Sequence, residues 1–113
     1  MKIEGEGQLV RVFIGEADRW HGKPLYQAIV ERMRGEGLAG ATVIKGIEGF
    51  GAASRLHTTR ILQLSTDLPV VIEIVDSREQ IDRILPMLDE MVGDGLVTLE
   101  KVHIITYRGK PKA

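Results

Sequence analysis

The stretch Val70-Val71-Ile72-Glu73-Ile74-Val75, followed at once by Ser77-Arg78-Glu79-Gln80, decides the fold because it joins a strand to a helix. The β-branched run predicts the strand. Ser77 with Gln80 three residues later predicts a capping box, in which each side chain satisfies a free backbone N–H of the other residue. The helix that follows has one apolar face, formed by Ile81, Ile84, Leu85 and Leu88. Pro86 lies inside this pattern and is expected to kink the helix or disrupt a turn.

The first half of the chain repeats this plan. Leu9–Ile14 predicts a strand, and Pro24 stands where the first turn of a helix tolerates proline. The apolar positions of this helix are Leu25, Ala28, Ile29 and Met33. A second strand begins at Ala41, and the last strand runs from about Val97 to Thr106. Two β-α-β units with right-handed crossovers predict an α+β, ferredoxin-like β-α-β-β-α-β sandwich, with an antiparallel four-stranded sheet and two helices on one face.

The bulk composition fits one domain spanning residues 1–113. The core must be aliphatic, because aromatic residues make up only 4% of the chain. A formal net charge of −1 gives no reason to expect nucleic acid as a partner. The absence of cysteine excludes disulfides and thiol chemistry. We expect residues 1–8 and 109–113 to be flexible ends. The N-terminus lacks the apolar region of a secretory signal and no apolar run approaches a membrane span, so a cytoplasmic location is expected.

The strands also predict an assembly. With both helices on one face, the other face of the sheet is uncovered, and a wet face should show alternation of apolar and polar residues. Leu9–Ile14 and Val70–Val75 instead carry apolar residues at both odd and even positions, and so on both faces of the sheet. Each such side chain gains about 1.5–3 kcal/mol from full burial. We therefore expect subunits to pack their open sheet faces together, with a cyclic homotrimer favoured. The alternative is that residues 48–69 fold back over the face.

The connection from residue 48 to residue 69 is far longer than a hairpin needs. It follows Gly46 and contains Gly49-Phe50-Gly51, where glycine permits positive φ or close approach of a ligand to the backbone. It continues with Arg55, His57 and several hydroxyl residues. Backbone N–H groups, hydroxyls and guanidinium groups together suit a phosphate. A glycine-rich loop with solvated arginines is the alternative interpretation.

Four motifs resemble the PII signalling family, and in particular its uncharacterised PII-like branch. They are Gly40-Ala41-Thr42-Val43, Gly49-Phe50-Gly51, Ile72-Glu73-Ile74-Val75 and Gly93-Asp94-Gly95, and the match spans about Leu9 to Arg108. The resemblance implies a homotrimer that binds an adenine nucleotide (AMP, ADP, ATP or a cyclic form) between subunits. The long loop would report occupancy to a target protein such as a membrane transporter or an enzyme.

Carried over residue by residue, the resemblance places Thr42 and Gly49-Phe50-Gly51 at the base and sugar, and Gly93-Asp94-Gly95 near the phosphates. The sequence also departs from the family. No tyrosine lies in residues 52–68, Leu96 stands where a lysine is expected, and the closing arginine pair is absent in register, with only Arg108 and Lys110 nearby. A triphosphate would therefore be poorly neutralised, and a mono- or diphosphate or a cyclic nucleotide is expected instead.

Two other functions stay open from the sequence. A trimer could gather three copies of His57 or His103 around its axis, which would make a metal-binding protein, although no histidine pair has the spacing of ligands on one helix turn. A small enzyme acting on a phosphorylated substrate would depend on Arg55 or His57. No acid, base or nucleophile stands out in the sequence, so we expect a binding protein rather than an enzyme, with no required cofactor.

Overall fold

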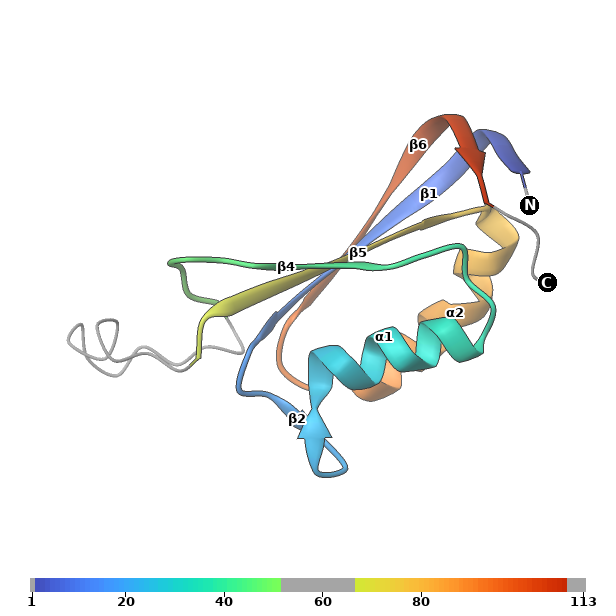
Figure 1. Ribbon diagram of the computed structural model, residues 1–113. Coiled ribbons are helices and arrows are strands. Elements are labelled where there is room, and N and C mark those ends of the chain that lie inside the picture. The colour runs from blue at the N-terminus through green and yellow to red at the C-terminus, as the bar shows by residue number, and fades with distance from the viewer. Residues whose placement is uncertain (1, 52–66, 110–113) are drawn as a thin grey trace.

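The computed structural model describes residues 2–51 and 67–109. Their elements are β1 (Lys2–Gly15), β2 (Arg19–Trp20), β3 (Lys23–Pro24), α1 (Leu25–Gly35), β4 (Thr42–Lys45), β5 (Pro69–Asp76), α2 (Arg78–Met91) and β6 (Leu96–Arg108). Four strands form one antiparallel sheet in the order β4-β5-β1-β6, and β2 pairs with β3 in a small hairpin. Both helices lie on one side of the sheet (Figure 1). The predicted ferredoxin-like fold is confirmed.

The core lies between the two helices and the sheet face that they cover. In β1 and β5 every second side chain faces the helices, so that Val10 lies opposite Ile74 and Val12 opposite Ile72. The fully buried side chains are Val10, Val12, Val70, Ile72, Ile74, Ile29, Met33, Ile81, Ile84 and Leu88. The core is therefore aliphatic, as the composition predicts.

The N-terminal strand is longer than the sequence suggests. We expected residues 1–8 to be flexible, but β1 begins at Lys2, which lies opposite Arg108 of β6. The expectation was wrong because the charged, glycine-rich composition does not reveal a partner strand far along the chain, and pairing overrides local propensity. Residues 110–113 of the expected C-terminal tail lie outside the described residues.

The start of α2 shows half of the predicted capping box. Ser77 Oγ accepts the backbone N–H of Gln80 at 3.3 Å, but the Gln80 side chain turns away and donates to the Gly37 carbonyl at 3.3 Å. The Ser77 N–H donates to Asp76 Oδ1 at 2.7 Å instead. The helix continues through Pro86 to Met91 as one element. Pro86 is exposed, so water can bond the carbonyl oxygen that its ring leaves free.

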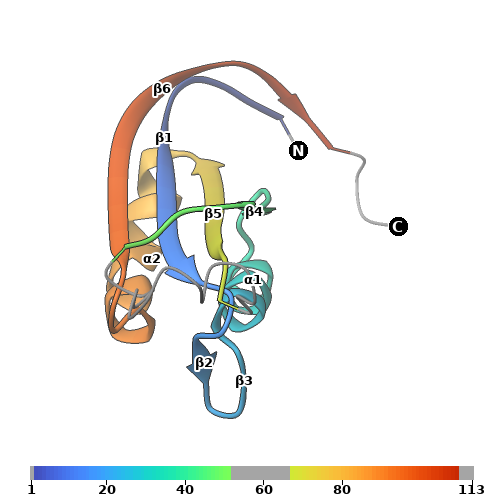
Figure 2. The same ribbon diagram turned by 90° about the vertical axis from the view of Figure 1, so that its left-hand side faces the viewer.

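The outer ends of β1 and β6 continue beyond the four-stranded part of the sheet. Along β1, the pairing with β5 covers only Gln8–Gly15, whereas the pairing with β6 extends as far as Lys2. We call Lys2–Gly7 and Val102–Arg108 the terminal ribbon. Figure 2 shows this ribbon bending away from the body of the sheet toward the side on which β4 lies. The consequence is that the end of β6 approaches elements at the opposite edge.

Candidate functional site

Thr42 begins β4, at one edge of the sheet. It lies opposite Glu73 of β5, whose side chain is on the face away from the helices, so Thr42 shares that open face. Its side chain is exposed. A ligand or a second subunit that covers the open face would therefore reach the Thr42 hydroxyl.

The glycine motif after β4 packs closely on Pro69. The Gly46 N–H donates to the Pro69 carbonyl at 2.7 Å, and a Cβ added to Gly49 would lie 3.2 Å from Pro69 Cγ. Gly49 has a φ of +151°, a backbone conformation that residues with a side chain rarely adopt. Phe50 follows with 75% of its surface exposed. Gly46 and Gly49 are thus required by this packing and by the backbone conformation, and the turn presents an aromatic side chain to solvent.

Gly93-Asp94-Gly95 connects α2 to β6 at the other edge of the sheet. A Cβ on Gly95 would lie 2.7 Å from the backbone oxygen of Phe13, whereas a Cβ on Gly93 would meet nothing within 4 Å. Gly95 is therefore required by the packing of the loop on β1. The space at Gly93 is open, so this residue is the one at which another molecule can approach the backbone closely.

The predicted site residues divide between opposite edges of the sheet. The turn at Gly49–Gly51 follows Lys45, which lies opposite Val70, and the loop at Gly93–Gly95 precedes Leu96, which lies opposite Phe13. Because Val70 pairs with Ile14 of β1, both turns are at the same end of the sheet. They are nevertheless separated by its width, since β4 and β6 are its two edges. One chain does not bring them together.

Arg108 is the last residue of β6, at the tip of the terminal ribbon, and is exposed. It lies at the end of the sheet from which β4 starts, away from the two glycine turns. Its neighbour Tyr107 donates a hydrogen bond to the Ala39 carbonyl at 3.0 Å. This hydrogen bond brings the end of β6 toward the segment that leads into Thr42. Arg55 and His57 lie outside the described residues.

The open face of the sheet carries a row of charges that sequence reasoning missed. Arg11 of β1 lies between Glu73 of β5 and Glu100 of β6, with Nε 2.9 Å from Glu73 Oε2 and Nη1 2.7 Å from Glu100 Oε1. The hydrogen bond to Glu73 is the largest of the effects that raise the pKa of Arg11, and Glu100 adds to them. The sequence did contain a sign of this row, because Arg11 and Glu73 are each the one charged residue in an otherwise apolar strand segment.

Apolar side chains surround this row. Phe13 lies opposite Leu96 and Ile44 lies opposite Val71, and these positions have the parity of the open face. Leu96 is 55% exposed, Ile44 46% and Phe13 37%. The expectation of an uncovered apolar face is met in the single chain, with an ion-pair row across its middle. Whether copies of the chain cover it stays a prediction.

A cluster of three aspartates, Asp18, Asp67 and Asp94, lies at the end of the sheet that bears the glycine turns. Asp18 Oδ2 accepts the Gly15 N–H at 2.9 Å, and Asp67 Oδ1 accepts the Ala17 N–H at 3.0 Å. Burial raises the pKa of Asp18, and the charges of Asp67 and Asp94 raise it further, against the opposing effect of the Gly15 N–H. The even spread of acids along the sequence gave no sign of this grouping. Its negative charge disfavours a highly charged anion beside Asp94.

The histidines were the candidates for a metal site. His103 is exposed on β6 opposite Glu6, and His21 stacks on Trp20 with ring centroids 4.4 Å apart. Among residues 2–51 and 67–109 no three histidine, aspartate or glutamate side chains are arranged to hold a metal ion. His57 lies outside that range.

No helix in the described part of the chain is long and apolar enough to cross a membrane.

These features define a class of protein, an α+β ferredoxin-like domain with helices on one face of its sheet and an uncovered, partly apolar face on the other. The chain belongs to the DUF190 family, whose model, described as "Uncharacterized ACR, COG1993", matches residues 7–104. It is 41% identical over 100 residues to a UPF0166 protein of Aquifex aeolicus, an alignment that covers 87% of this chain and 92% of that protein. It is 36% identical over 106 residues to the UPF0166 protein MJ1524 of Methanocaldococcus jannaschii, covering 93% and 95% of the two chains.

Proposed function

We propose that this chain is a PII-like sensor that assembles as a homotrimer and binds an adenine nucleotide in the seams between subunits. The observation that carries the proposal is the position of the two glycine turns, which lie at the same end of the sheet but at opposite edges. In a cyclic assembly each subunit offers two different surfaces to its two neighbours. Such a ring would set the β4 edge of one subunit against the β6 edge of the next.

The open sheet face supports the same assembly. Phe13, Ile44 and Leu96 form an exposed apolar surface, and single chains rarely leave such a surface in water. Packing these faces together would bury the apolar residues and would place Thr42 and Gly93, from different subunits, at one seam. Phe50 is free to stack on a base, because its ring is exposed at the turn that begins the long connection.

The charges favour a nucleotide with few phosphates. Leu96 takes the place of the lysine that PII proteins are expected to carry there, and Asp94 lies within electrostatic reach of Asp18. Three further negative charges on a triphosphate would be poorly compensated at this loop. We therefore expect AMP, ADP or a cyclic nucleotide to bind more tightly than ATP. The segment from residue 48 to residue 69 would then carry the signal to a target protein.

Two measurements test the proposal together. Light scattering coupled to gel filtration gives the oligomeric state, and calorimetry against AMP, ADP, ATP, cyclic AMP and cyclic di-AMP gives the ligand. We expect a mass of three chains and one nucleotide per subunit. A chain that stays monomeric at the calorimetry concentration, or a trimer that binds none of the five ligands, would refute the sensor.

A matched pair of variants tests the residues. Thr42→Val removes a hydroxyl from the β4 edge, and Thr98→Val makes the same change on β6, where Thr98 lies opposite Arg11 on the same open face. Losing one hydrogen bond to a ligand weakens binding by about threefold to tenfold. Thr42→Val should show this loss and Thr98→Val should not. Equal affinities in the two variants would remove Thr42 from the site.

A further inference from the structure

The terminal ribbon requires a contact elsewhere in the fold to hold its position. It consists of only two strands, because β5 ends its pairing with β1 at Gln8. A two-stranded ribbon has little stability of its own in water. Figure 2 shows that it does not extend straight from the sheet but arches over toward the side of β4.

Gly5 marks the position of the bend. The pairing register between β1 and β6 shifts between Ile3 and Gly5, and Gly5 has a φ of +94°. A Cβ added to Gly5 would meet nothing within 4 Å, so glycine is required by the backbone conformation and not by lack of space. Ile104 packs directly on Gly7, where a side chain would collide with it. In the same bend, Gly5 is thus required by its backbone conformation and Gly7 by the packing of Ile104.

The bend brings Tyr107 to the connection between α1 and β4. Its hydroxyl donates to the Ala39 carbonyl at 3.0 Å, and its side chain is half-buried there. The N–H of the same residue, Ala39, donates to Asp76 Oδ2 at 2.7 Å. Asp76 is 3% exposed and holds its position by accepting the Ser77 N–H as well. Both backbone polar groups of Ala39 are therefore fixed, one by β5 and one by the terminal ribbon.

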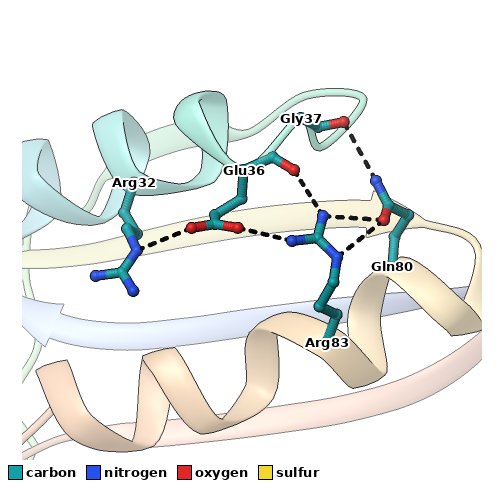
Figure 3. A network of polar contacts seen from close by, with 5 residues as sticks. All are labelled: Arg32, Glu36, Gly37, Gln80 and Arg83. Atoms are coloured by element: carbon teal, nitrogen blue, oxygen red, sulfur yellow. Dashed lines mark hydrogen bonds and ion pairs between the residues drawn. The ribbon is translucent and has the colours of Figure 1, made fainter.

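The same connection is fixed by α2 a few residues earlier. Figure 3 shows Arg83 reaching Glu36, with Nη2 2.6 Å from the backbone oxygen and Nη1 2.7 Å from Oε1, while Gln80 donates to Gly37. Arg32 Nε lies 3.3 Å from the other oxygen of the Glu36 carboxylate. Asp76, Gln80 and Arg83 are close in sequence and come from the end of β5 and the first half of α2. Tyr107 differs from them because it comes from the far edge strand.

We propose that Tyr107 is a positioning residue that ties the terminal ribbon to Ala39 and thereby fixes β4. The chain runs from Ala39 to Thr42 in three residues, and Tyr107 directly precedes Arg108. One hydrogen bond thus links β6, one edge strand of the sheet, to the connection that leads into β4, the other edge strand. The effect on nucleotide binding rests on the proposed function, whereas the effect on β4 itself does not.

Amide hydrogen exchange of Tyr107→Phe without nucleotide tests the positioning directly. This variant keeps the ring and removes the hydroxyl, and loss of one hydrogen bond should speed local opening by about threefold to tenfold. We expect faster exchange in Thr42–Lys45 and in Val102–Arg108, with Ile72 and Ile74 of β5 unchanged. Tyr26→Phe is the control, since Tyr26 is a half-buried tyrosine that packs on the core from α1. Unchanged exchange in β4, or equal acceleration throughout the chain, would overturn the proposal.

Gly5→Ala gives an independent test at the other end of the ribbon. The added methyl group has space but strains the backbone at positive φ, so the ribbon should leave its curve and release the same hydrogen bond. The double variant with Tyr107→Phe should then show no more acceleration in Thr42–Lys45 than Gly5→Ala alone. Additive acceleration would mean that the ribbon does not act through Tyr107.

Nucleotide titration separates this proposal from the function on which it partly rests. If the unmodified protein binds no nucleotide, the sensor fails while the exchange result on β4 still decides the role of Tyr107. If it binds, Tyr107→Phe should weaken binding by about threefold to tenfold and Tyr26→Phe should leave it unchanged. Binding that is equal in both variants would show that Tyr107 does not position the site.

Discussion

On the helix-covered face of the sheet Ile72 and Ile74 are completely buried, whereas on the other face Ile44 is nearly half exposed and Leu96 more than half. Both faces are built from the same aliphatic residue types. They differ in the charged row Glu73–Arg11–Glu100, which crosses the open face, whereas the one buried charged residue in the described part of the chain is Asp76, at the end of β5.

The difference shows what each face is suited to contact. A purely aliphatic face packs against any apolar helix of the right shape, and the stability gained follows the area buried. An apolar face crossed by ion pairs is more selective, because a partner must leave those pairs intact or replace them. The open face therefore suits a defined partner surface, which in the proposed assembly is that of a second copy of the same chain.

The largest effect is expected from a matched isoleucine pair. Ile72→Ala removes a fully buried side chain and should lower the free energy of unfolding by about 3 kcal/mol. Ile44→Ala makes the same change on the open face and should cost under about 1 kcal/mol in a dilute single chain. Denaturant unfolding at several protein concentrations measures both. If the open face is an interface, the cost of Ile44→Ala will grow as the concentration rises. If the two variants lose the same free energy of unfolding at every protein concentration, the two faces do not differ in the way described.

The second effect separates the two glycines of the loop before β6. Gly95→Ala places a methyl group 2.7 Å from the Phe13 backbone oxygen and should cost about 2 kcal/mol of stability. Gly93→Ala meets open space and should leave the thermal midpoint nearly unchanged. The same Gly93→Ala protein should bind nucleotide more weakly if a ligand approaches this backbone. A stable Gly93→Ala variant with unaltered affinity would assign the whole motif to folding.

The third effect concerns Arg11. In a single chain its pairs with Glu73 and Glu100 are partly exposed, and such pairs add little to stability. In a closed assembly Arg11→Ala would leave two buried carboxylates without their partner, so the assembly should dissociate at a concentration at least about tenfold higher. Lys23→Ala, which breaks the exposed pair with Glu31 away from the sheet, is the control. Light scattering over a dilution series reads the result, and coincident dissociation curves would place Arg11 outside any interface.

Local patterns in the sequence were enough to predict the fold. The β-branched run at Val70–Val75 became β5, and the Ser77 cap and the apolar spacing of α2 followed as expected, because each depends on neighbours within a few residues. Lys2–Gly7 could not be predicted in the same way. Its two glycines and two glutamates disfavour a strand, and its pairing with Val102–Arg108 appears only when both ends of the chain are placed together.

The candidate site was predictable only in part for a similar reason. The glycine turns were found where the sequence indicated, yet their separation across the sheet depends on strand order, which no single motif reveals. Gly95 was assigned to a ligand but is required by Phe13, a contact between distant segments. The hydrogen bond from Tyr107 to Ala39 joins the terminal ribbon to the connection before β4, which is again a contact between distant segments.

The smallest effect is expected at Asp18, beside the same loop. Its pKa is raised above the ordinary value of 3.8, so the folded chain binds this proton more tightly than the unfolded chain does. The favourable contribution is therefore complete below pH 3.8 and is lost as the pH rises through the folded pKa. Asp18→Asn keeps an oxygen to accept the Gly15 N–H and removes the charge, so it should be slightly more stable than the parent at pH 7.

That advantage of Asp18→Asn should shrink as the pH falls toward 3.8 and vanish below it. Thermal melts across this range measure the difference, and a constant difference at every pH would show that the charge of Asp18 is not the cause. Because Asp67 and Asp94 add to the shift, a bound cation or the positive group of a neighbouring subunit would lower the pKa of Asp18. The pH dependence should then weaken in any assembly or complex that places positive charge beside these aspartates.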